Sequence, residues 1–570
     1  MKIGLIGINM YPKYLNFACG LHMYAFQQFL SQNGIESKII DYKPVYFNNF
    51  DMRHPADYYK QQYAAEESKK PASPEAKLQK EEHLEVLREQ ILAWEALYEE
   101  RESRYDKFQS FIDRNYIKTE AEFDSDLLEV QDPGFDCYIC VTDVIWNLLP
   151  THTYDRGFFL ASKAMDGKQK IAYAASRGVP VPYSEQEKSL FFHYLEDIDA
   201  ISVREESLKE FIEQNSDKHA TLVLDPVLLQ NREFWQHHSC KPKEKGYILL
   251  YYVMEKASNT ISAAVAYAKK HNLTIIEISD RPEKNGRVQD PDVKHVAKYD
   301  VSMEEWLGYI EHADCIFTNS FHGCCFSIIF EKRFYVGYRN GDKVTNILNM
   351  FHLQELRLPT EDELRARNHS FFRKCLRKLK LIDPASEVLR SMPQNVNYDP
   401  VREILRQKRA ESQNFILSAI ENAEKRSSTG NPPKDTASRE AFRKNISYPV
   451  RYHSGTPDAT NTYDTQQSGH RVEKLSSGNS EYLVENQLYK NDGTSKLEKN
   501  QFQLKGHSFQ GWRLRLKIDN RWFWYMNDGT LSLDINNPHS GGVRIFQDES
   551  LIPYIPVGRI RLIVVEAVWS

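Results

Sequence analysis

The pattern of hydrophobic and polar positions divides the chain into segments of different structural type. Up to about residue 350, short apolar runs alternate with stretches whose apolar residues recur at helical spacing. The first run, KIGLIGI (2–8), is followed by the amphipathic stretch GLHMYAFQQFLSQNG (20–34) and a second run, ESKIIDY (36–42). This β-α-β opening predicts an α/β protein whose parallel sheet is covered on both faces by helices.

The alternation of strands and helices restarts after a charged linker, CKPKEKG (240–246). Further candidate strands before it are CYICV, KIAYAA, AISV and TLVLDP, and those after it are YILLYYV, LTIIEIS, CIFTN and FYVGY. Helical spacing follows near 259–270 and 303–311, from about residue 321, and in an amphipathic segment at 398–425. We therefore expect two successive domains, 1–240 and 241–425, with the last helix as a crossover.

A helical insertion is expected within the first domain, at about 55–118. Ser73 followed by Pro74 is a good helix start, because the hydroxyl can cap free amides and the proline ring presets the first turn. The apolar residues that follow recur at spacings of three and four: Leu84, Leu87, Ile91, Trp94, Tyr98, Tyr105, Phe108 and Ile112. This stripe predicts one long helix or a helix pair that packs on its own domain, with coiled-coil dimerisation as the alternative.

The C-terminal part of the chain is different in composition. Residues 426–441 are rich in Gly, Pro, Ser and Thr, which is typical of a linker. From 442 to 570, short alternating stretches rich in aromatics are separated by turn sequences such as NDGT, which predicts a small all-β domain. Its aromatics could be core or could stack on sugar rings; the candidates are Trp512, Trp522, Trp524 and Tyr525.

Composition and charge narrow the class of protein. Among 570 residues, 27% are charged and both signs are interspersed, with a net charge of −5, which disfavours a nucleic-acid binder. No apolar stretch reaches the roughly 18 to 20 residues of a membrane span, and the N-terminus turns polar too early for a signal peptide. The eight cysteines are scattered. We expect a cytoplasmic protein without a disulfide framework or zinc site, because Cys137 and Cys140 would face opposite sides of one strand.

The segment CIFTNSFHGCCFSIIF (315–330) interrupts an apolar run with small polar residues. If a strand ends here and a helix begins, Asn319, Ser320, Phe321 and His322 lie at the carboxyl end of a parallel strand, where α/β sheets bind ligands. Free amides at the helix start attract phosphate or carboxylate, and Gly323 would let a ligand or another backbone approach. The alternative is structural, with Ser320 as a helix cap and His322 as a hydrogen-bonded surface residue.

Six segments, in order, resemble motifs of the polysaccharide pyruvyl transferase family over about residues 1–420. They are NFACGLHMYAFQQFL (16–30), DCYICVTDVIWN (136–147), KIAYAASRG (170–178), ISVREES (201–207), LDPVLL (224–229) and ADCIFTNSFHGCCFSIIFEKRFYV (313–336). The resemblance implies two Rossmann-like domains that face a cleft, as in the GT-B arrangement. It also implies transfer of a pyruvyl group from phosphoenolpyruvate to two hydroxyls of one sugar, giving a cyclic ketal and phosphate, with no cofactor and no metal.

Site residues carried over from this resemblance fall into three groups. The catalytic candidates are His322 for phosphate contact or proton transfer, Arg204 as a clamp for the anionic donor, and Asp143 for the sugar hydroxyls. An ion pair with Glu205 or Glu206 is the alternative for Arg204, and a loop cap is the alternative for Asp143. The remaining candidates are Asn319, Ser320, Phe321, Gly323 and Arg339 for the donor, and Asn16, His22, Trp146 and Asn147 for the acceptor. Asp225 is expected to fix the turn before Pro226.

Two departures from the family pattern fall in the N-terminal half. The first-helix motif usually reads N-Y-G-x-x-L-Q, whereas this chain has Asn16-Phe17-Ala18 and His22. The usual G-S-D is Val141-Thr142-Asp143. Both lie where the acceptor is expected, so the expectation is firmer for the donor than for the sugar.

Three hypotheses about function remain open at this point. The first is a pyruvyl transferase acting on a lipid- or nucleotide-linked saccharide, where a lipid-linked acceptor would bring the protein to the inner face of the membrane. The second is a glycosyltransferase that uses a nucleotide-sugar donor. The third is a non-catalytic carbohydrate-binding or scaffold protein.

Overall fold

The computed structural model describes most of the chain up to residue 428 and the strands of a C-terminal sheet. The described residues are 1–10, 15–44, 50–71, 73–125, 127–129, 131–149, 152–178, 183–253, 258–339, 341–360, 363, 389, 392–428 and, for the sheet, six strands between 472 and 569. They form two compact units: one comprises 1–147, 156–181 and 194–431, and the other comprises 148–155, 182–193 and 432–570. Most of the expected linker, 429–441, lies outside the described residues.

The first parallel sheet occupies the N-terminal half of the larger unit. Its order is β3 (Lys118–Phe123), β2 (Ser37–Tyr42), β1 (Ile3–Gly7), β4 (Cys137–Asp143), β5 (Gln169–Ala175), β6 (Ala200–Val203) and β7 (Ala220–Leu222). All neighbouring strands pair in parallel, and the accompanying helices are α1 (Phe17–Gln32), α6 (Glu206–Asn215) and α7 (Arg232–His237). Helix α5 (Glu185–Glu196) includes the boundary between the two units. Every residue of β4 is buried, as expected for a central strand covered on both faces.

The second parallel sheet has the same kind of winding. Its order is β10 (His295–Lys298), β9 (Thr274–Ser279), β8 (Tyr247–Tyr252), β11 (Cys315–Thr318) and β12 (Phe334–Val336). Its helices are α8 (Ser258–His271), α9 (Met303–His312), α10 (Phe321–Ile329) and α11 (Lys343–Met350). The predicted fold class, two Rossmann-like sheets in a GT-B-like arrangement, is confirmed.

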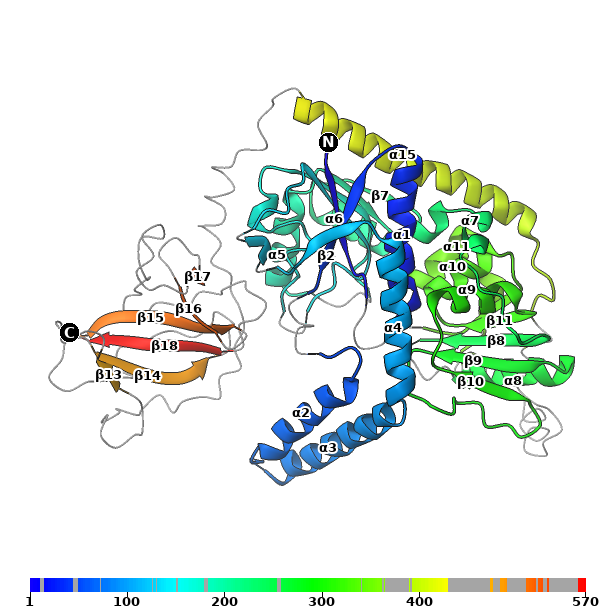
Figure 1. The fold of residues 1–570 in the computed structure, drawn as a ribbon, viewed down its shortest axis with the longest axis horizontal. Helices are drawn as coiled ribbons and strands as arrows, with labels where there is room; N and C mark the ends of the chain where they lie inside the picture. Colours follow the sequence, from blue (N-terminus) through cyan, green and yellow to red (C-terminus); the bar gives the residue numbers. More distant parts are fainter. Residues whose placement is uncertain are drawn as a thin grey trace. The chain divides into compact units, whose positions relative to one another are not determined.

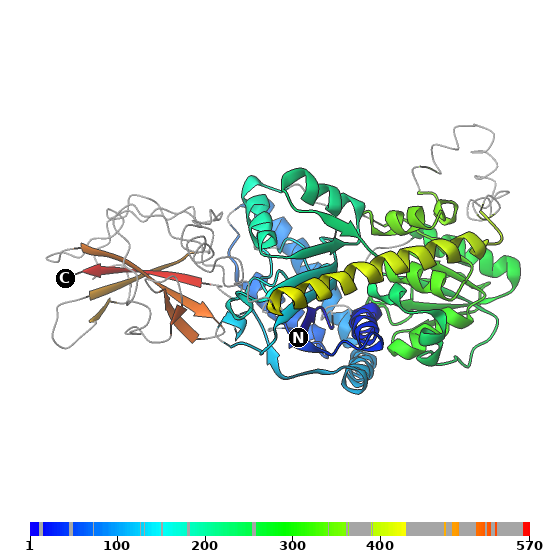
Figure 2. The same ribbon diagram turned by 90° about the horizontal axis from the view of Figure 1, so that it is seen from above.

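The long helix α15 (Tyr398–Ser428) links the two halves of the larger unit, crossing over both in Figures 1 and 2. At its start, the Tyr398 hydroxyl donates to the backbone carbonyl of Lys332 in the second half. Further along, the Ser412 hydroxyl accepts from the backbone amide of Leu224 in the first half. No helix in the described part of the chain is both long and apolar enough to cross a lipid bilayer.

The expected helical insertion consists of α2 (Pro55–Ser68), α3 (Pro74–Glu95) and α4 (Tyr98–Asn115). The Ser73 hydroxyl caps α3 by accepting from the Ala76 amide, so the predicted helix start is confirmed. Part of the predicted stripe is buried against its own chain, namely Leu87, Trp94, Phe108 and Ile112, whereas Tyr98 is 46% exposed. The Arg104 guanidinium on α4 is buried and donates to the backbone carbonyls of Leu15 and Ser279, one in each half.

The C-terminal unit carries an antiparallel sheet. Its order is β13 (Val472–Lys474), β14 (Tyr482–Tyr489), β18 (Leu562–Trp569), β15 (Phe509–Ile518), β16 (Arg521–Tyr525) and β17 (Leu531–Ser532). All neighbouring strands in this order pair antiparallel, as expected for a small β domain. Whether its tryptophans form core or a sugar-stacking surface stays a prediction, because their side chains lie outside the description.

Two helical glycines give a test of the packing. A β-carbon on Gly308 of α9 would lie 1.7 Å from the backbone oxygen of Cys240, which is rigid. A β-carbon on Gly20 of α1 would meet only the flexible end of Met303, at 2.4 Å. Both changes to alanine gain the same helix propensity, so we expect Gly308→Ala to destabilise the larger unit by about 1–3 kcal/mol more than Gly20→Ala. Thermal unfolding measures this difference; equal melting temperatures would contradict the packing.

Candidate active site

Polar side chains from both sheets meet beside the carboxyl ends of their strands. Doubly wound sheets bind ligands where the strand order reverses, which is between β1 and β4 in the first sheet and between β8 and β11 in the second. Asp143 is the last residue of β4, and His322 lies in the first turn of α10, just after β11. The other members come from the neighbouring strand ends: Arg204 after β6, Asp225 after β7 and Lys343 after β12.

The Arg204 guanidinium is the centre of this cluster. Its Nη2 lies 3.0 Å from Asp143 Oδ1, and its Nη1 donates to Asp225 Oδ2. Its side chain is 2% exposed, and its Cζ lies 4.8 Å from the ring centroid of Phe321. Arg204 is therefore held between the carboxylates of Asp143 and Asp225, which are not the partners that the ion-pair interpretation named. Glu205 is more distant, at 3.9 Å from Nε.

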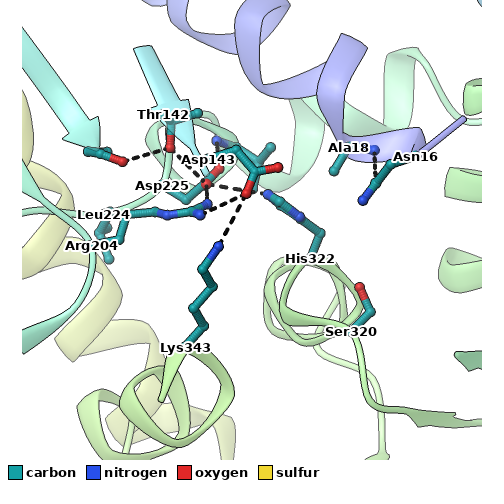
Figure 3. A network of polar contacts seen from close by, with 12 residues as sticks. Asn16, Ala18, Thr142, Asp143, Arg204, Leu224, Asp225, Ser320, His322 and Lys343 are labelled. Atoms are coloured by element: carbon teal, nitrogen blue, oxygen red, sulfur yellow. Dashed lines mark hydrogen bonds and ion pairs between the residues drawn. The ribbon is translucent and has the colours of Figure 1, made fainter. Parts of the chain in front are cut away.

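Two contacts connect this first-sheet cluster to the second sheet (Figure 3). His322 Nε2 lies 3.3 Å from Asp225 Oδ2, and both side chains are buried. Lys343 Nζ, on the first residue of α11, lies 3.4 Å from Asp143 Oδ1. One polar network thus joins residues that are 97 and 200 positions apart in the chain.

Electrostatics fix the charge of the two carboxylates. Burial by itself would raise the pKa of Asp143, but Lys343 and Arg204 hold that pKa well below its usual value. Burial opposes ionisation of Asp225 too, and His322 and Arg204 lower its pKa in the same way. Both carboxylates are therefore ionised at neutral pH and able to accept hydrogen bonds.

Lys343 and Glu205, at the edge of the network, also have shifted pKa values. Burial and the nearby charge of Arg204 lower the pKa of Lys343, while Asp143 partly offsets this effect. Burial raises the pKa of the Glu205 carboxyl. Both shifts have the direction expected for buried ionisable groups, and shifted pKa values of this kind are common at functional sites.

Backbone strain is concentrated at the Asp143 position. Thr142 and Asp143 have positive φ angles of 44° and 62°, in a conformation that glycine adopts easily and β-branched residues rarely adopt. The Thr142 hydroxyl donates to the Ala174 carbonyl at 2.9 Å and lies 3.3 Å from Asp225 Oδ2. These contacts hold the strained turn, which presents the Asp143 carboxylate to Arg204 and Lys343.

The predicted donor residues divide into structural and site residues. The Asn319 side chain bonds both backbone groups of Val253, and the Ser320 hydroxyl accepts from the Gly323 amide as a helix cap. A β-carbon on Gly323 would lie 2.5 Å from Thr318 Oγ1, so this glycine is needed for packing within the chain. Phe321 contacts Arg204, and Arg339 lies close enough to Lys343 to affect its pKa.

The predicted acceptor residues are also only partly brought together. The Asn16 side chain caps α1 through the Ala18 amide and lies apart from the network in Figure 3. Trp146 is fully buried, donates to the Phe158 carbonyl and stacks on Phe159 at 5.1 Å. Asn147 is half-buried. His22 is the member of this group that lies beside the network, with its ring centroid 6.1 Å from that of His322.

Two members of the network have roles that sequence reasoning did not assign. Asp225 does fix its turn, by accepting from the Val227 amide, but its Oδ2 also binds Arg204 and His322. Lys343 was not identified. It follows the strand FYVGY, so the strand-end argument that selected His322 and Arg339 could have found it four residues further on.

Solved structures with a similar chain path are distant in sequence. The UDP-N-acetylglucosamine 2-epimerase from Rickettsia bellii is 10% identical, with a TM-score of 0.37 over 75% of this chain and 99% of that chain. UDP-GlcNAc 2-epimerase from Neisseria meningitidis is 12% identical, with a TM-score of 0.37 over 74% of this chain and 100% of that chain. T4 phage BGT, solved with UDP and Mn2+, is 13% identical, with a TM-score of 0.34 over 74% of this chain and 99% of that chain.

The family comparison covers most of the residues that form the site. No curated protein matches the sequence. The sequence model of the family described as polysaccharide pyruvyl transferase matches residues 19–340, more than half of the chain. The matched range begins in α1, includes the whole second sheet and every strand of the first sheet except β1, and ends just before Lys343. The chain therefore belongs to the polysaccharide pyruvyl transferase family.

Proposed function

We propose that the protein transfers the pyruvyl group of phosphoenolpyruvate to two hydroxyls of one sugar in a cell-surface polysaccharide precursor. The product is a cyclic ketal, and inorganic phosphate is released. The acceptor in this proposal is lipid- or nucleotide-linked. Family membership supports transfer to a polysaccharide, and the polar network at the strand ends supports this chemistry.

The reaction requires movement of two protons. The methylene carbon of phosphoenolpyruvate gains a proton and becomes a methyl group, which makes the adjacent carbon electrophilic. One sugar hydroxyl attacks that carbon and loses its proton, the carbon–oxygen bond to phosphate breaks, and the second hydroxyl closes the ketal. Of the two protons that the hydroxyls lose, one balances the methyl group and the other leaves with phosphate. The site must therefore contain an acid, a base and groups that stabilise an anion.

His322 and Asp225 supply the acid in this proposal. Asp225 Oδ2 lies 3.3 Å from His322 Nε2, an arrangement in which a carboxylate orients an imidazole for proton transfer. The other ring nitrogen, Nδ1, then exchanges a proton with the donor. His322 also lies in the first turn of α10, where backbone amides favour an anion.

Lys343 supplies a group that stabilises an anion, and Asp143 supplies the base. Arg204 already pairs closely with two carboxylates, so its charge mainly organises them. Lys343 has one longer contact, at 3.4 Å, and is better placed to reach the phosphate or carboxylate of the donor. Asp143 lies at the strained strand end, where it can accept a hydrogen bond from a sugar hydroxyl. The hydroxyl proton becomes strongly acidic as its oxygen bonds to the electrophilic carbon, so a weakly basic carboxylate can take it up.

A single observation carries the proposal. Two pairs, Asp225 with His322 and Asp143 with Lys343, join a carboxylate of the first sheet to a basic side chain of the second within 3.4 Å, and Asp143 and His322 stand at the switch points of their sheets. A donor anion on the second sheet and a sugar hydroxyl on the first could then react across this network.

Replacement of His322 tests the acid role. We expect the full chain to release phosphate from phosphoenolpyruvate with a suitable saccharide, and the product to gain the mass of one pyruvate ketal. His322→Asn should lower turnover by about 10²- to 10⁴-fold, because proton transfer is lost, while circular dichroism and melting temperature stay close to those of the wild type. His352→Asn is the matched control, since His352 is exposed with a positive φ that asparagine tolerates.

The acceptor panel should include free, nucleotide-linked and lipid-linked saccharides. Absence of phosphate release with every acceptor, together with no calorimetric binding of phosphoenolpyruvate, would refute the proposed reaction. Binding of a nucleotide sugar more tightly than phosphoenolpyruvate would favour glycosyl transfer instead. Glycan binding that persists unchanged without any turnover would favour a non-catalytic role.

Replacement of Lys343 tests donor binding separately. A charge-assisted contact to phosphate or carboxylate contributes about 1.5–3 kcal/mol, so Lys343→Met should raise the Kd for phosphoenolpyruvate about ten- to a hundredfold. Lys38→Met is the control, because Lys38 is exposed on β2. Isothermal calorimetry measures both variants. Equal affinity of the Lys343 variant and the wild type would remove Lys343 from the donor site.

A further inference from the structure

Three side chains beside the network have the donor types and spacing of a metal site. Cys19 and His22 are three residues apart on α1, so they share one face of the helix. Asp143 approaches from the end of β4. Their potential ligand atoms, a thiol sulfur, an imidazole nitrogen and a carboxylate oxygen, all lie within 4.8 Å of one another.

This spacing is close to that of a bound ion. Zinc is held by sulfur at about 2.3 Å and by nitrogen or oxygen at about 2.0–2.2 Å, so ligand atoms around one tetrahedral ion are roughly 3.3–3.8 Å apart. Small side-chain rotations would contract the observed cluster to that size. The three side chains lie on two rigid elements, a helix and a central strand, so the backbone need not move.

His22 provides an independent indication that a ligand belongs here. Its side chain is fully buried, and neither ring nitrogen has a hydrogen-bond partner. A buried polar group without a hydrogen-bond partner is unfavourable, so its burial indicates that a bound partner belongs there. Burial also lowers the pKa of His22 to about 4, which leaves the ring in the neutral form that binds metals.

Asp143 can serve the network and a metal at the same time. Arg204 and Lys343 both contact its Oδ1, which leaves Oδ2 for a second partner. The strained turn at Thr142 and Asp143 fixes the direction of this carboxylate. The positive charges of neighbouring side chains disfavour a bound cation, but the Asp225 carboxylate balances the charge of Arg204. The negative charges of one thiolate and one carboxylate together neutralise a divalent ion.

We propose that Cys19, His22 and Asp143 bind a divalent transition-metal ion of the zinc type. One thiolate, one imidazole and one carboxylate suit zinc, whereas magnesium and calcium prefer ligand sets made of oxygen alone. Three protein ligands leave one tetrahedral position for an oxygen ligand, as in catalytic zinc sites. His22 stands where the family motif has glutamine, so the site is expected in this chain and not in relatives that keep the glutamine.

Metal titration of the full chain tests the proposal independently of the transferase reaction. After removal of metals with a chelator, the protein is titrated with Co²⁺ and then with Zn²⁺. We expect one Co²⁺ per chain, with a thiolate-to-cobalt charge-transfer band in the near ultraviolet, and displacement of this Co²⁺ by Zn²⁺. Lack of binding by the wild type, while it retains its native melting transition, would overturn the site.

Three variants identify the ligands. Cys19→Ser should abolish the charge-transfer band, and His22→Gln, which restores the residue of the family motif, should weaken Co²⁺ binding about 100-fold or more. Cys240→Ser is the matched control, because Cys240 is an exposed thiol, and it should bind Co²⁺ like the wild type. If Cys19→Ser does not fold, His22→Gln decides the question. A band that survives either ligand substitution at unchanged affinity, or that is lost in Cys240→Ser, would contradict the assignment.

Discussion

The buried guanidinium of Arg204 is the group on which the arrangement of the site depends. Asp143 and Asp225 hold it from two strand ends of one sheet, and the same carboxylates contact Lys343 and His322 from the other sheet. Removing one partner of a buried ion pair leaves an uncompensated charge and costs about 3–5 kcal/mol. The ion pairs with Arg204 therefore fix the two ionised carboxylates of the first sheet in place. As a consequence, these carboxylates face the basic side chains of the second sheet.

Much of the fold follows from local patterns, but some elements do not. The apolar runs predicted the central strands, and Ser73 with Pro74 predicted the start of α3. The edge strands β3 and β10 were missed, because at least half of the residues in KTEAEF and HVAK are polar and all of them except Phe123 are at least partly exposed. Such strands are specified by pairing with a neighbour more than by their own hydrophobicity, so a single-sequence pattern carries little signal for them.

Some residues of the site could be predicted from the local sequence, whereas the contacts between distant residues could not. His322 could be selected from its position at a helix start after a strand, and Asp143 and Arg204 from motifs that the family shares. The contact between Asp225 and His322 spans 97 residues and that between Asp143 and Lys343 spans 200, so no local spacing predicts either. The left-handed conformations of Thr142 and Asp143 could not be predicted either, because neither residue is glycine.

A crystal structure of the protein with phosphoenolpyruvate bound tests the central claim most directly, namely that one network at the ends of both sheets forms the active site. The account predicts that a phosphate or carboxylate oxygen of the donor lies within hydrogen-bonding distance of Lys343 Nζ. It also predicts that the His322 ring faces the methylene carbon or the phosphate. A donor bound elsewhere, with no contact to Lys343 or His322, would contradict the account.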